Sequence, residues 1–392
     1  MTELRSAAAE EFSLTRGGPF YQLLRLIGLG DERRAHFLIR ALVIVAFAWL
    51  PLCVLSIIQG DAYGTHLEIP FFRDIAVNVR FLVALPILIV AEANIDLRWR
   101  SLVEEFLRSR LIQAPELPLF EAEIRRVTRL RDRMLPETLL AFSAYSSIFF
   151  GWHSELLIGN VSNWHAHGSG ASLAGWWFAF VSAPLFRFLL LRWLWRLFLW
   201  TLFLWRISKI DLNLVATHTD LSGGLGFLSL GQNRLCAIVF AGGAVVASQA
   251  GNAIAHNGAT LDGMKFVLIG YGFLAVVLFA APLLVMMPIL MRARVGALLN
   301  YGALVASHNQ AFASKWTSEY EPHGDEILGN PDPSSLIDLG SSFQVVQQMK
   351  VVPISRSTLI ILATSAVLPM IPLVILVTPA DQLIGVVLKM LM

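Results

Sequence analysis

The sequence predicts an all-α protein, a polytopic bundle of about seven transmembrane helices. Of its 392 residues, 56% are hydrophobic and only 15% are charged, whereas soluble domains average about 25% charged residues. Apolar runs of about 20 residues, the length that crosses a bilayer as a helix, recur along the chain. Lysines and arginines gather between certain runs and avoid others, which indicates an orientation. These observations predict a multi-pass membrane protein whose first partner is the lipid bilayer.

The N-terminal segment, residues 1–35, is mixed and polar. It lacks a short apolar core followed by a small-residue cleavage site, so we expect no cleaved signal peptide. Residues 20–29 predict a short amphipathic helix that lies on the membrane surface. Residues 36–95 then hold the first two spans, about 37–58 and 75–93, and the second span contains Pro86.

Residues 96–136 are too charged to cross a membrane. They carry nine arginines between Arg98 and Arg133, with two apolar stripes at helical spacing on either side of Pro115 and Pro118. Such stripes are typical of surface helices that bury one face. The region predicts a pair of amphipathic cytoplasmic helices joined by a proline turn.

Residues 137–291 hold four further predicted spans, at about 138–158, 173–206, 235–255 and 266–290. The fourth is longer than a bilayer needs, and its second half interleaves arginine with tryptophan, which is typical of a helix leaving the membrane. Residues 292–356 predict a second soluble, cytoplasmic region. Residues 357–392 predict a last span, about 359–377, and a short amphipathic tail.

The positions of lysine and arginine orient this scheme. Of 30 such residues, all but Arg73, Arg80, Lys265 and Lys389 fall on one side or at its interface when the spans are threaded in order. The positive-inside rule therefore predicts a cytoplasmic N-terminus and an external C-terminus. We find no internal repeat, which disfavours an inverted-repeat transporter.

A glycine-rich loop, residues 217–233, precedes the fifth span. From Leu221 to Gln232 it has no charge, and its glycines are Gly223, Gly224, Gly226 and Gly231. It is apolar enough to enter lipid and too rich in glycine for a plain helix. Two interpretations stay open, a re-entrant element that lines a path and an interfacial loop under a helix elbow. The glycines lack the spacing of a dinucleotide or P-loop motif, so we predict no cofactor.

The fifth span carries small residues at every fourth position, which would let a neighbouring helix approach closely. These residues are Gly243, Ala247, Gly251 and Ala255. Beside this groove, Ser248, Gln249 and Asn252 place a hydroxyl and two amides at membrane depth. Such groups need a partner or water there, so they are either pore-lining residues or interhelical hydrogen-bonding residues.

His218 and Asp220 come just before the glycines. The pair could hold a cation or relay a proton, because histidine titrates near neutral pH. The alternative is a turn in which Asp220 satisfies free backbone groups before the next helix.

Two arginines lie within predicted spans. Arg80 lies about 8 Å inside the outer end of the second span, where a charge costs a few kcal/mol unless it pairs. Glu155 or His153, near the outer end of the third span, is a reachable partner. Arg187 falls in the inner third of the fourth span, where it either attracts anions or extends its side chain to the interface.

Histidines such as His165 gather near the outer face, but no carboxylate or cysteine completes a ligand set. We therefore predict no metal site. No H-E-x-x-H, G-x-S-x-G or S-x-x-K motif occurs, so we also predict no catalytic residue.

Three segments, LFRFLLLRWLWR, THTDLSGGLGFL and LGNPDPSSLIDLGSSFQVVQQM, resemble a family of uncharacterised bacterial multi-pass membrane proteins. In that family a proline usually lies between the histidine and the aspartate, where this chain has Thr219. The resemblance implies a bacterial inner membrane and supplies no activity.

The first functional hypothesis is therefore a homo-oligomeric channel or transporter subunit for a small ion or solute. Arginine-rich cytoplasmic helices favour a small anion. A membrane-embedded enzyme that uses His218 and Asp220 on a lipid-linked phosphate is the second hypothesis. A non-transporting scaffold or sensor is the third, and we expect no nucleic-acid partner for any of them.

Overall fold

The structure is a computed structural model that describes residues 6–30, 34–63, 67–156, 162–167, 170–317 and 331–377, without the side chains of 34–36, 147–156, 167 and 375–377. The predicted all-α bundle is confirmed. Seven helical segments of the described chain are long and apolar enough to cross a membrane. They are Phe37–Gln59, Ile75–Arg108, Leu173–Ile207, Leu228–His256, Leu261–Leu284, Met287–Trp316 and Arg356–Val374.

Six of these segments overlap predicted spans. The predicted third span is also helical, as α7 (Met134–Leu156). The remaining segment, Met287–Trp316, begins at the end of the predicted sixth span and continues through residues that we predicted to be soluble. The tail after residue 377 lies outside the described residues.

The N-terminal segment is not confined to the surface of the bundle. After α1 (Ala7–Glu10), Phe12 and Leu14 are completely or almost completely buried. Asp96 accepts hydrogen bonds from the Ser13 hydroxyl (2.7 Å) and from the amide of Leu14 (3.2 Å). The segment thus threads into one end of the bundle, before α2 (Pro19–Leu26) and α3 (Arg34–Gln59).

The second span and the first predicted amphipathic helix form one continuous rod. After the short turn η1 (Phe71–Arg73), the rod contains α4 (Ile75–Val79), η2 (Arg80–Ala84) and α5 (Leu85–Arg108). The element η2 is a π-helical turn directly before Pro86, which cannot donate a backbone hydrogen bond. The wider turn lets the rod pass the proline without a break.

The second predicted amphipathic helix is α6 (Leu117–Arg131), after the turn η3 (Ala114–Glu116), and it packs on α9. Helix α7 follows. A two-stranded antiparallel ribbon, β1 (Ala166–His167) and β2 (Gly170–Ala171), precedes the next rod. That rod contains α8 (Leu173–Trp177), the π-helical turn η4 (Phe178–Ser182) and α9 (Ala183–Ile207).

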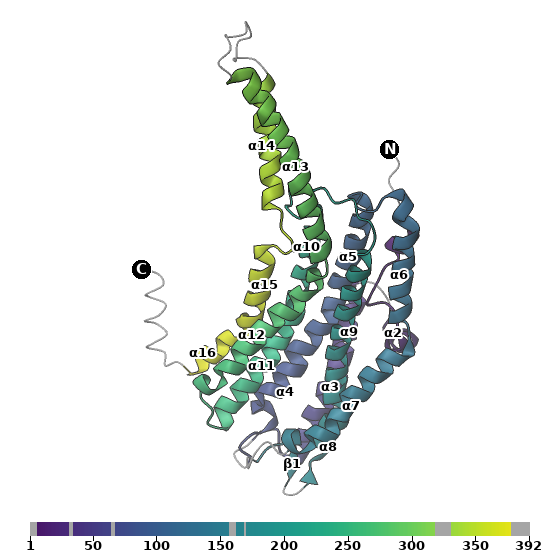
Figure 1. The fold of residues 1–392 in the computed structure, drawn as a ribbon. Coiled ribbons are helices and arrows are strands. Elements are labelled where there is room, and N and C mark those ends of the chain that lie inside the picture. The colour runs from purple at the N-terminus through teal and green to yellow at the C-terminus, as the bar shows by residue number, and fades with distance from the viewer. Residues whose placement is uncertain are drawn as a thin grey trace.

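The last third of the chain begins after the glycine loop. Its elements are α10 (Leu228–Gln232), η5 (Asn233–Leu235), α11 (Cys236–His256), α12 (Leu261–Leu284), α13 (Met287–Trp316), α14 (Pro331–Gln348), α15 (Arg356–Val367), η6 (Leu368–Met370) and α16 (Ile371–Val377). Helices α13 and α14 lie side by side and extend beyond the rest of the bundle (Figure 1).

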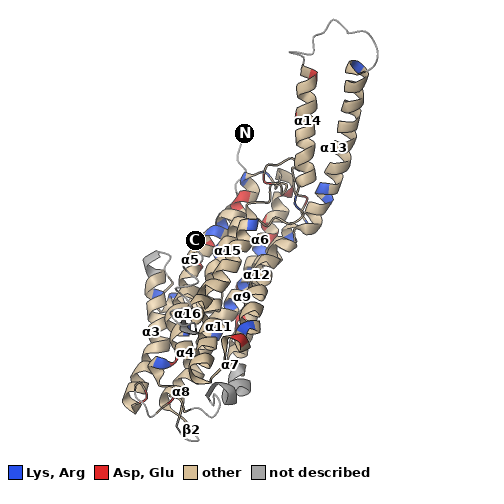
Figure 2. Cartoon of the chain, turned by 90° about the vertical axis from the view of Figure 1, so that its left-hand side faces the viewer, with Lys and Arg blue, Asp and Glu red and all other residues tan. Residues whose placement is uncertain are grey.

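Two ends of the bundle can be distinguished in Figure 1. The hairpin end carries the N-terminal segment, α6 and the base of the α13–α14 pair. The ribbon end carries β1, β2 and the turn between α11 and α12. Charged residues are dense around the N-terminal segment and α6, whereas the helices between the two ends are mostly uncharged (Figure 2).

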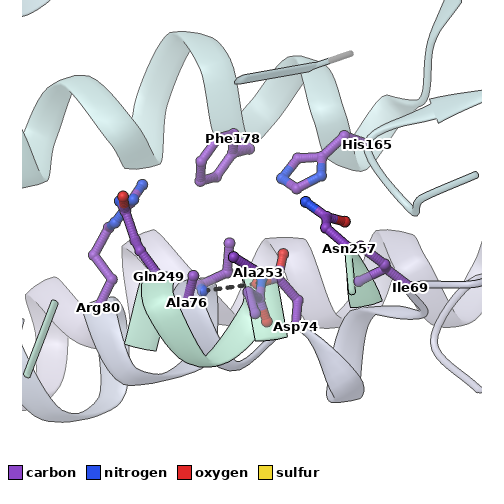
Figure 3. Close-up of a pocket in the computed structure, with 11 residues that line it drawn as sticks. Ile69, Asp74, Ala76, Arg80, His165, Phe178, Gln249, Ala253 and Asn257 are labelled. Carbon is purple, nitrogen blue, oxygen red and sulfur yellow. Dashed lines mark hydrogen bonds between the residues drawn. The ribbon is translucent and has the colours of Figure 1, made fainter. Parts of the chain in front are cut away.

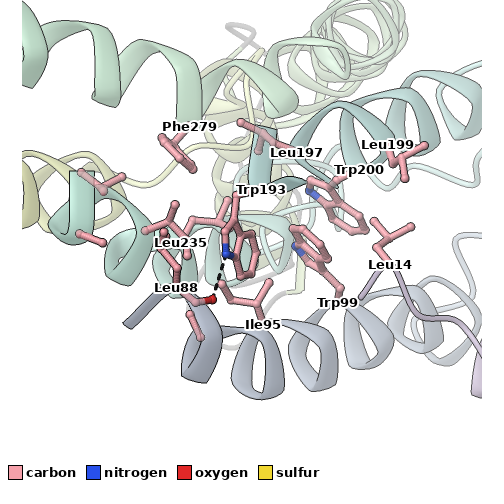
Figure 4. Packing of buried hydrophobic residues seen from close by; sticks show 14 of the residues in the cluster. Leu14, Leu88, Ile95, Trp99, Trp193, Leu197, Leu199, Trp200, Leu235 and Phe279 are labelled. Atoms are coloured by element: carbon pink, nitrogen blue, oxygen red, sulfur yellow. Dashed lines mark hydrogen bonds between the residues drawn. The ribbon is translucent and has the colours of Figure 1, made fainter. Parts of the chain in front are cut away.

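The buried core runs along α5, α9 and α11. Trp99 of α5 stacks on Trp200 of α9 with ring centroids 5.4 Å apart. Trp193 donates its indole N–H to the Leu88 carbonyl at 3.0 Å (Figure 4). Large aromatic side chains bury much apolar area, and an indole inside a core needs an acceptor such as this carbonyl.

Helix α11 is the central element, in contact with α4, α12 and α15. The small-residue groove is used within the chain. A Cβ on Gly243 would lie 2.8 Å from the Ala366 carbonyl oxygen and 3.2 Å from Pro369 Cγ. On the next turns, Gly251 faces Leu373. The segment from α15 to α16 therefore packs into this groove.

Candidate functional site

A cavity of about 360 Å³ opens near the ribbon end, between the α4–α5 rod, the α8–α9 rod and α11. Its lining residues are Ile69, Asp74, Ala76, Val77, Arg80, His165, Phe178, Gln249, Asn252, Ala253 and Asn257. Figure 3 shows Arg80 and Gln249 together at one end, and His165, Asn257 and Ile69 at the other. A cavity of this size that gathers a few polar groups is the usual form of a small-molecule site.

Asp74 fixes the wall of the cavity where two helices meet. Its Oδ1 accepts the Val77 amide at 3.0 Å, as the N-cap of α4, and the Asn252 side-chain amide at 2.8 Å. Its Oδ2 accepts the Trp164 indole N–H at 3.0 Å. Asn252 in turn accepts the Ile75 amide at 2.9 Å. The Asn252 side chain thus joins α11 to the start of α4, as an interhelical hydrogen-bonding residue that also lines the cavity.

Arg80 supplies the positive charge of the cavity. It belongs to the π-helical turn η2 and is partly exposed. Its guanidinium carbon lies 5.9 Å from the Phe178 ring centroid and 5.8 Å from that of Phe186. Cation–π contacts at these distances hold the guanidinium in place. The partners predicted for Arg80, Glu155 and His153, have side chains outside the described residues.

Gln249 lies beside Arg80 and is exposed (Figure 3). Its amide is therefore available to a solute, whereas the amide of Asn252 is bound to Asp74 and the Ile75 backbone. Among the polar residues predicted on this helix, Gln249 is the one that opens into the cavity.

Both rods that border the cavity have a π-helical turn at the same depth. Phe81 of η2 and Phe178 of η4 are in edge-to-face contact, with ring centroids 6.3 Å apart. Single π-helical turns inside α-helices concentrate at functional sites, because they re-aim side chains and loosen the helix locally. The sequence signal for these turns was weak, with Pro86 and Pro184 just after them.

His165 forms part of the opposite end of the cavity. It is 2% exposed and stacks on Trp164, with ring centroids 3.8 Å apart, and against Phe178 at 4.8 Å. Among the described residues, no group of three or more histidines, cysteines and carboxylates could hold a metal ion.

An apolar layer closes the cavity toward the hairpin end. Phe81, Leu85 and Leu88 of the α4–α5 rod are at most 1% exposed, and Leu189 of α9 is also buried. Glu92, the next ionisable residue after Arg80 on this rod, lies 12 residues further, about 18 Å at the helical rise of 1.5 Å per residue.

Beyond this layer lies a buried ionic cluster that we did not predict. Glu92 accepts hydrogen bonds from Arg196 Nη1 at 2.8 Å and from Arg40. Arg192 Nη1 lies 3.9 Å from Glu92, and its Nε donates to Glu137 at 3.2 Å. All five side chains are at most 8% exposed. The cluster ties α3, α5, α7 and α9 together.

The N-terminal segment completes this cluster, since the Phe20 amide donates to Glu137 at 2.7 Å. A sequence signal for the cluster existed. Glu92 is an acidic residue inside a predicted span, and such a residue needs a cationic partner. The sequence alone does not say which arginine supplies it.

The glycine loop is organised around Asp220. Its Oδ1 accepts the amides of Ser222 (2.8 Å) and Gly224 (3.1 Å), and its Oδ2 accepts the Gly226 amide at 2.7 Å. His218 Nδ1 lies 2.9 Å from Asp220 Oδ1. Burial opposes ionisation of this carboxyl, but the three amides and His218 outweigh it and lower its pKa below the ordinary value.

This geometry matches the turn alternative for His218 and Asp220. The loop reverses at Gly223 (φ 65°) and Gly224 (φ 96°), which a residue with a side chain rarely adopts. Re-entry of the loop into lipid stays a prediction.

A second cavity, about 480 Å³, lies at the hairpin end. It is lined by Ser208, Lys209, Ile210, Asp211, Leu212, Leu214, Ile289, Arg292 and Ala293. Neither His218 nor Asp220 lines it, so the two residues predicted for an enzyme do not lie in either described cavity.

Two other predicted site residues lie elsewhere. Ser248 is buried and donates its hydroxyl to the Val245 carbonyl of its own helix at 2.8 Å. Arg187 is partly exposed on α9. Neither residue lines the cavity near the ribbon end, so of the predicted residues the structure brings together Arg80, Gln249 and Asn252.

The fold and the cavity define a multi-pass α-helical membrane protein with a polar chamber near one end of its bundle. No family model matches the chain, and no curated protein or solved structure matches it. The resemblance to an uncharacterised bacterial family thus stays a prediction.

Proposed function

We propose that this protein is a transporter for a small anion in a bacterial inner membrane, with its N-terminus in the cytoplasm. The observation that carries the proposal is the one-sided cavity near the ribbon end, with Arg80 at its inner end and Gln249 beside it. A guanidinium next to an amide suits a carboxylate or a similar oxyanion, which it can bind through two parallel hydrogen bonds.

The orientation follows from the positive-inside rule. Nine arginines lie between Arg98 and Arg133, a stretch that includes α6 at the hairpin end (Figure 1). Arg73 contacts His256 at the end of α11, and Lys265 is in the first turns of α12, so both lie near the ribbon end. An excess of lysine and arginine favours the cytoplasmic side. The cavity therefore faces the outside of the cell.

A transporter explains the closed inner end better than an open channel does. A conducting channel needs a continuous wet path, whereas an alternating-access protein exposes its site to one side at a time. The apolar layer of Phe81, Leu85 and Leu88 and the ionic cluster around Glu92 separate the cavity from the hairpin end. The π-helical turns η2 and η4 lie at the cavity, where local rearrangement would change access.

The volume of the cavity favours a small organic anion over a bare halide. Water occupies about 30 Å³ per molecule in the liquid, so about 360 Å³ holds roughly ten waters. A carboxylate of a few carbon atoms fits this space together with part of its hydration shell.

The enzyme hypothesis has less support. The two oxygens of Asp220 are occupied by three backbone amides, and neither Asp220 nor His218 lines a described cavity. A carboxylate held in this way stabilises a turn.

The test is uptake by the purified full-length protein in liposomes. We would measure uptake of labelled lactate, succinate and chloride, and compare Arg80→Gln, Arg80→Lys and Lys265→Gln with the unchanged protein. Lys265 is exposed at the same end but outside the cavity, so Lys265→Gln controls for loss of one positive charge.

We expect Arg80→Gln to lower uptake of the transported anion at least about tenfold, equivalent to 1.4 kcal/mol. Arg80→Lys should keep part of the activity, since lysine retains the charge but not the planar pair of donors. Gln249→Leu should also lower uptake, and it leaves the Asp74–Asn252 contact intact. Equal uptake by Arg80→Gln and Lys265→Gln would contradict the proposal.

A further inference from the structure

The second cavity, about 480 Å³ at the hairpin end, has charged residues that the proposed transport does not use. It lies between two walls, at the base of the α13–α14 pair (Figure 1). One wall is the segment that follows α9, residues 208–214, and the other is the first two turns of α13. Lys209 and Asp211 belong to the first wall and Arg292 to the second. All three residues are exposed, so a ligand can reach them from solution.

The three charges do not neutralise one another. In the part of the chain that the structure describes, none of them forms an ion pair. Lys209 Nζ lies 3.6 Å from the centroid of the Trp205 ring, and Arg292 donates its Nε–H to the Pro288 carbonyl at 3.4 Å. These contacts position the two cations but leave most of their N–H donors free. The cavity therefore offers two cations and one carboxylate to a ligand.

The glycine loop holds the two walls together. The Val215 amide, directly after the first wall, donates to the Gly223 carbonyl at 3.2 Å. A Cβ on Gly223 would lie 3.5 Å from Leu214 Cβ and 3.5 Å from Leu290 Cδ2, so Gly223 packs between the first wall and α13. The turn that Asp220 stabilises thus fixes the shape of this cavity.

The cavity begins where the apolar part of α9 ends. The candidate span Leu173–Ile207 stops directly before Ser208, the first lining residue. Trp205 is exposed near the end of this span, and Met287 and Met291 are exposed on the first turns of α13. A tryptophan beside lysine or arginine at the end of an apolar helix is typical of a membrane–water interface. Exposed apolar side chains next to a charged cavity suit a ligand with a polar head and an apolar remainder.

The signs of the charges define the class of ligand. A phosphodiester has one negative charge, and its oxygens accept hydrogen bonds from lysine and arginine, here from both walls. Asp211 repels a ligand that is only anionic, whereas it attracts an ammonium group. A ligand that has both a phosphate and an ammonium complements all three charges. Basic pockets between helices on the cytoplasmic side are a recurrent form of headgroup site.

We propose that this cavity binds a phosphoethanolamine group, with the phosphate between Lys209 and Arg292 and the ammonium at Asp211. A phospholipid of the surrounding bilayer and a soluble phosphodiester present the same two charges. The site is separate from the cavity near the ribbon end, so the inference does not depend on transport of an anion.

Binding to the purified full-length protein tests the proposal. We would measure equilibrium binding of two labelled probes in mild detergent, a short-chain phosphatidylethanolamine and the soluble glycerophosphoethanolamine. Tighter binding of the lipid identifies the bilayer as the source of the group, and equal binding of the two probes identifies a soluble ligand. Binding of neither probe would overturn the proposal.

Variants of the two cations assign the binding to this cavity. We expect Lys209→Gln and Arg292→Gln each to weaken binding of phosphatidylethanolamine at least about tenfold, because each removes charge-assisted hydrogen bonds to the phosphate. Lys350→Gln is the matched control, since Lys350 is exposed at the same end of the bundle but outside the cavity. Binding that is unchanged in either cavity variant would overturn the proposal.

Asp211→Asn tests the position of the ammonium. Phosphatidylglycerol has the phosphate without the ammonium, so the unchanged protein should prefer phosphatidylethanolamine by about fivefold. Asp211→Asn should remove this preference, whereas Asp338→Asn, which changes an exposed carboxylate on α14, should keep it. All substituted positions are exposed, so unfolding temperatures should change by no more than about 1 °C, which separates lost binding from lost folding. No preference in the unchanged protein, or a preference that Asp211→Asn retains, would contradict the proposal.

Discussion

Removal of one carboxylate should weaken the whole hairpin end of the bundle. Glu92 is 5% exposed and accepts hydrogen bonds from Arg196 (2.8 Å) and Arg40. Glu92→Gln keeps the shape of the side chain and removes its charge, which leaves three buried arginines against Glu137 alone. Removal of one partner from a buried ion pair costs about 3–5 kcal/mol.

Thermal unfolding in detergent would measure this loss. At about 2 °C per kcal/mol for a chain of this size, the expected fall in Tm is about 6–10 °C. Glu104→Gln is the matched control, because Glu104 is an exposed carboxylate on the same helix. Its Tm should change by no more than about 1 °C, as for most surface substitutions.

A double variant separates charge from other causes. Arg40→Gln in the Glu92→Gln background removes one uncompensated cation, so the double variant should unfold at a higher temperature than the sum of the single effects predicts. If Glu92→Gln unfolds at the same temperature as Glu104→Gln, the buried cluster does not hold the bundle together.

Three further outcomes are expected. Gly243→Ala should lower the free energy of unfolding by about 1–3 kcal/mol, because the new Cβ would press on α15. Gly270→Ala should raise it by about 0.5–1 kcal/mol, because a Cβ at position 270 would have no neighbour within 4 Å. The unfolding temperatures of the two variants give the comparison, and equal shifts would contradict the tight α11–α15 contact. Phe12→Ala should cost about 3–5 kcal/mol and speed proteolysis of the N-terminal segment, since Phe12 is 0% exposed. Asp220→Asn should destabilise the protein at pH 7. Because the pKa of Asp220 is lowered in the folded protein, its carboxylate stabilises the fold above pH about 4 and loses this effect as pH falls through the lowered pKa. The difference in Tm between the variant and the unchanged protein should therefore shrink below pH about 4, and a difference independent of pH would contradict the role of the charge.

The sequence was sufficient to predict the class of fold, because the need to satisfy backbone groups in lipid allows few solutions for long apolar segments. It also located Arg80, Gln249 and Asn252 as polar groups within spans. It did not predict that they meet. The contact between Asp74 and Asn252 joins residues 178 positions apart, and such pairings depend on helix packing that periodicity does not encode.

Other errors have local causes. The surface helix expected at residues 20–29 is present as the mostly exposed helix α2 (Pro19–Leu26), but we did not predict that Ser13 and Leu14, which precede it, form buried contacts with Asp96, because these contacts depend on a distant helix. The second span was expected to end near residue 93, before the charged residues begin, whereas α5 continues without a break to Arg108. The turn around Asp220 was one of two alternatives, since an aspartate that precedes glycines often binds backbone amides.

The most direct test of the account is the side from which the cavity can be reached. In the background of Cys53→Ala and Cys236→Ala, Gln249→Cys would be exposed to a membrane-impermeant maleimide in intact cells and in inverted vesicles, with Asn257→Cys as a control at the mouth of the cavity. We expect both cysteines to be labelled from outside the cell, and Gln249→Cys to be labelled more slowly from the cytoplasmic side, because an alternating-access protein exposes its site to that side only in the opposite state. Labelling of Gln249→Cys only from the cytoplasmic side would contradict the account.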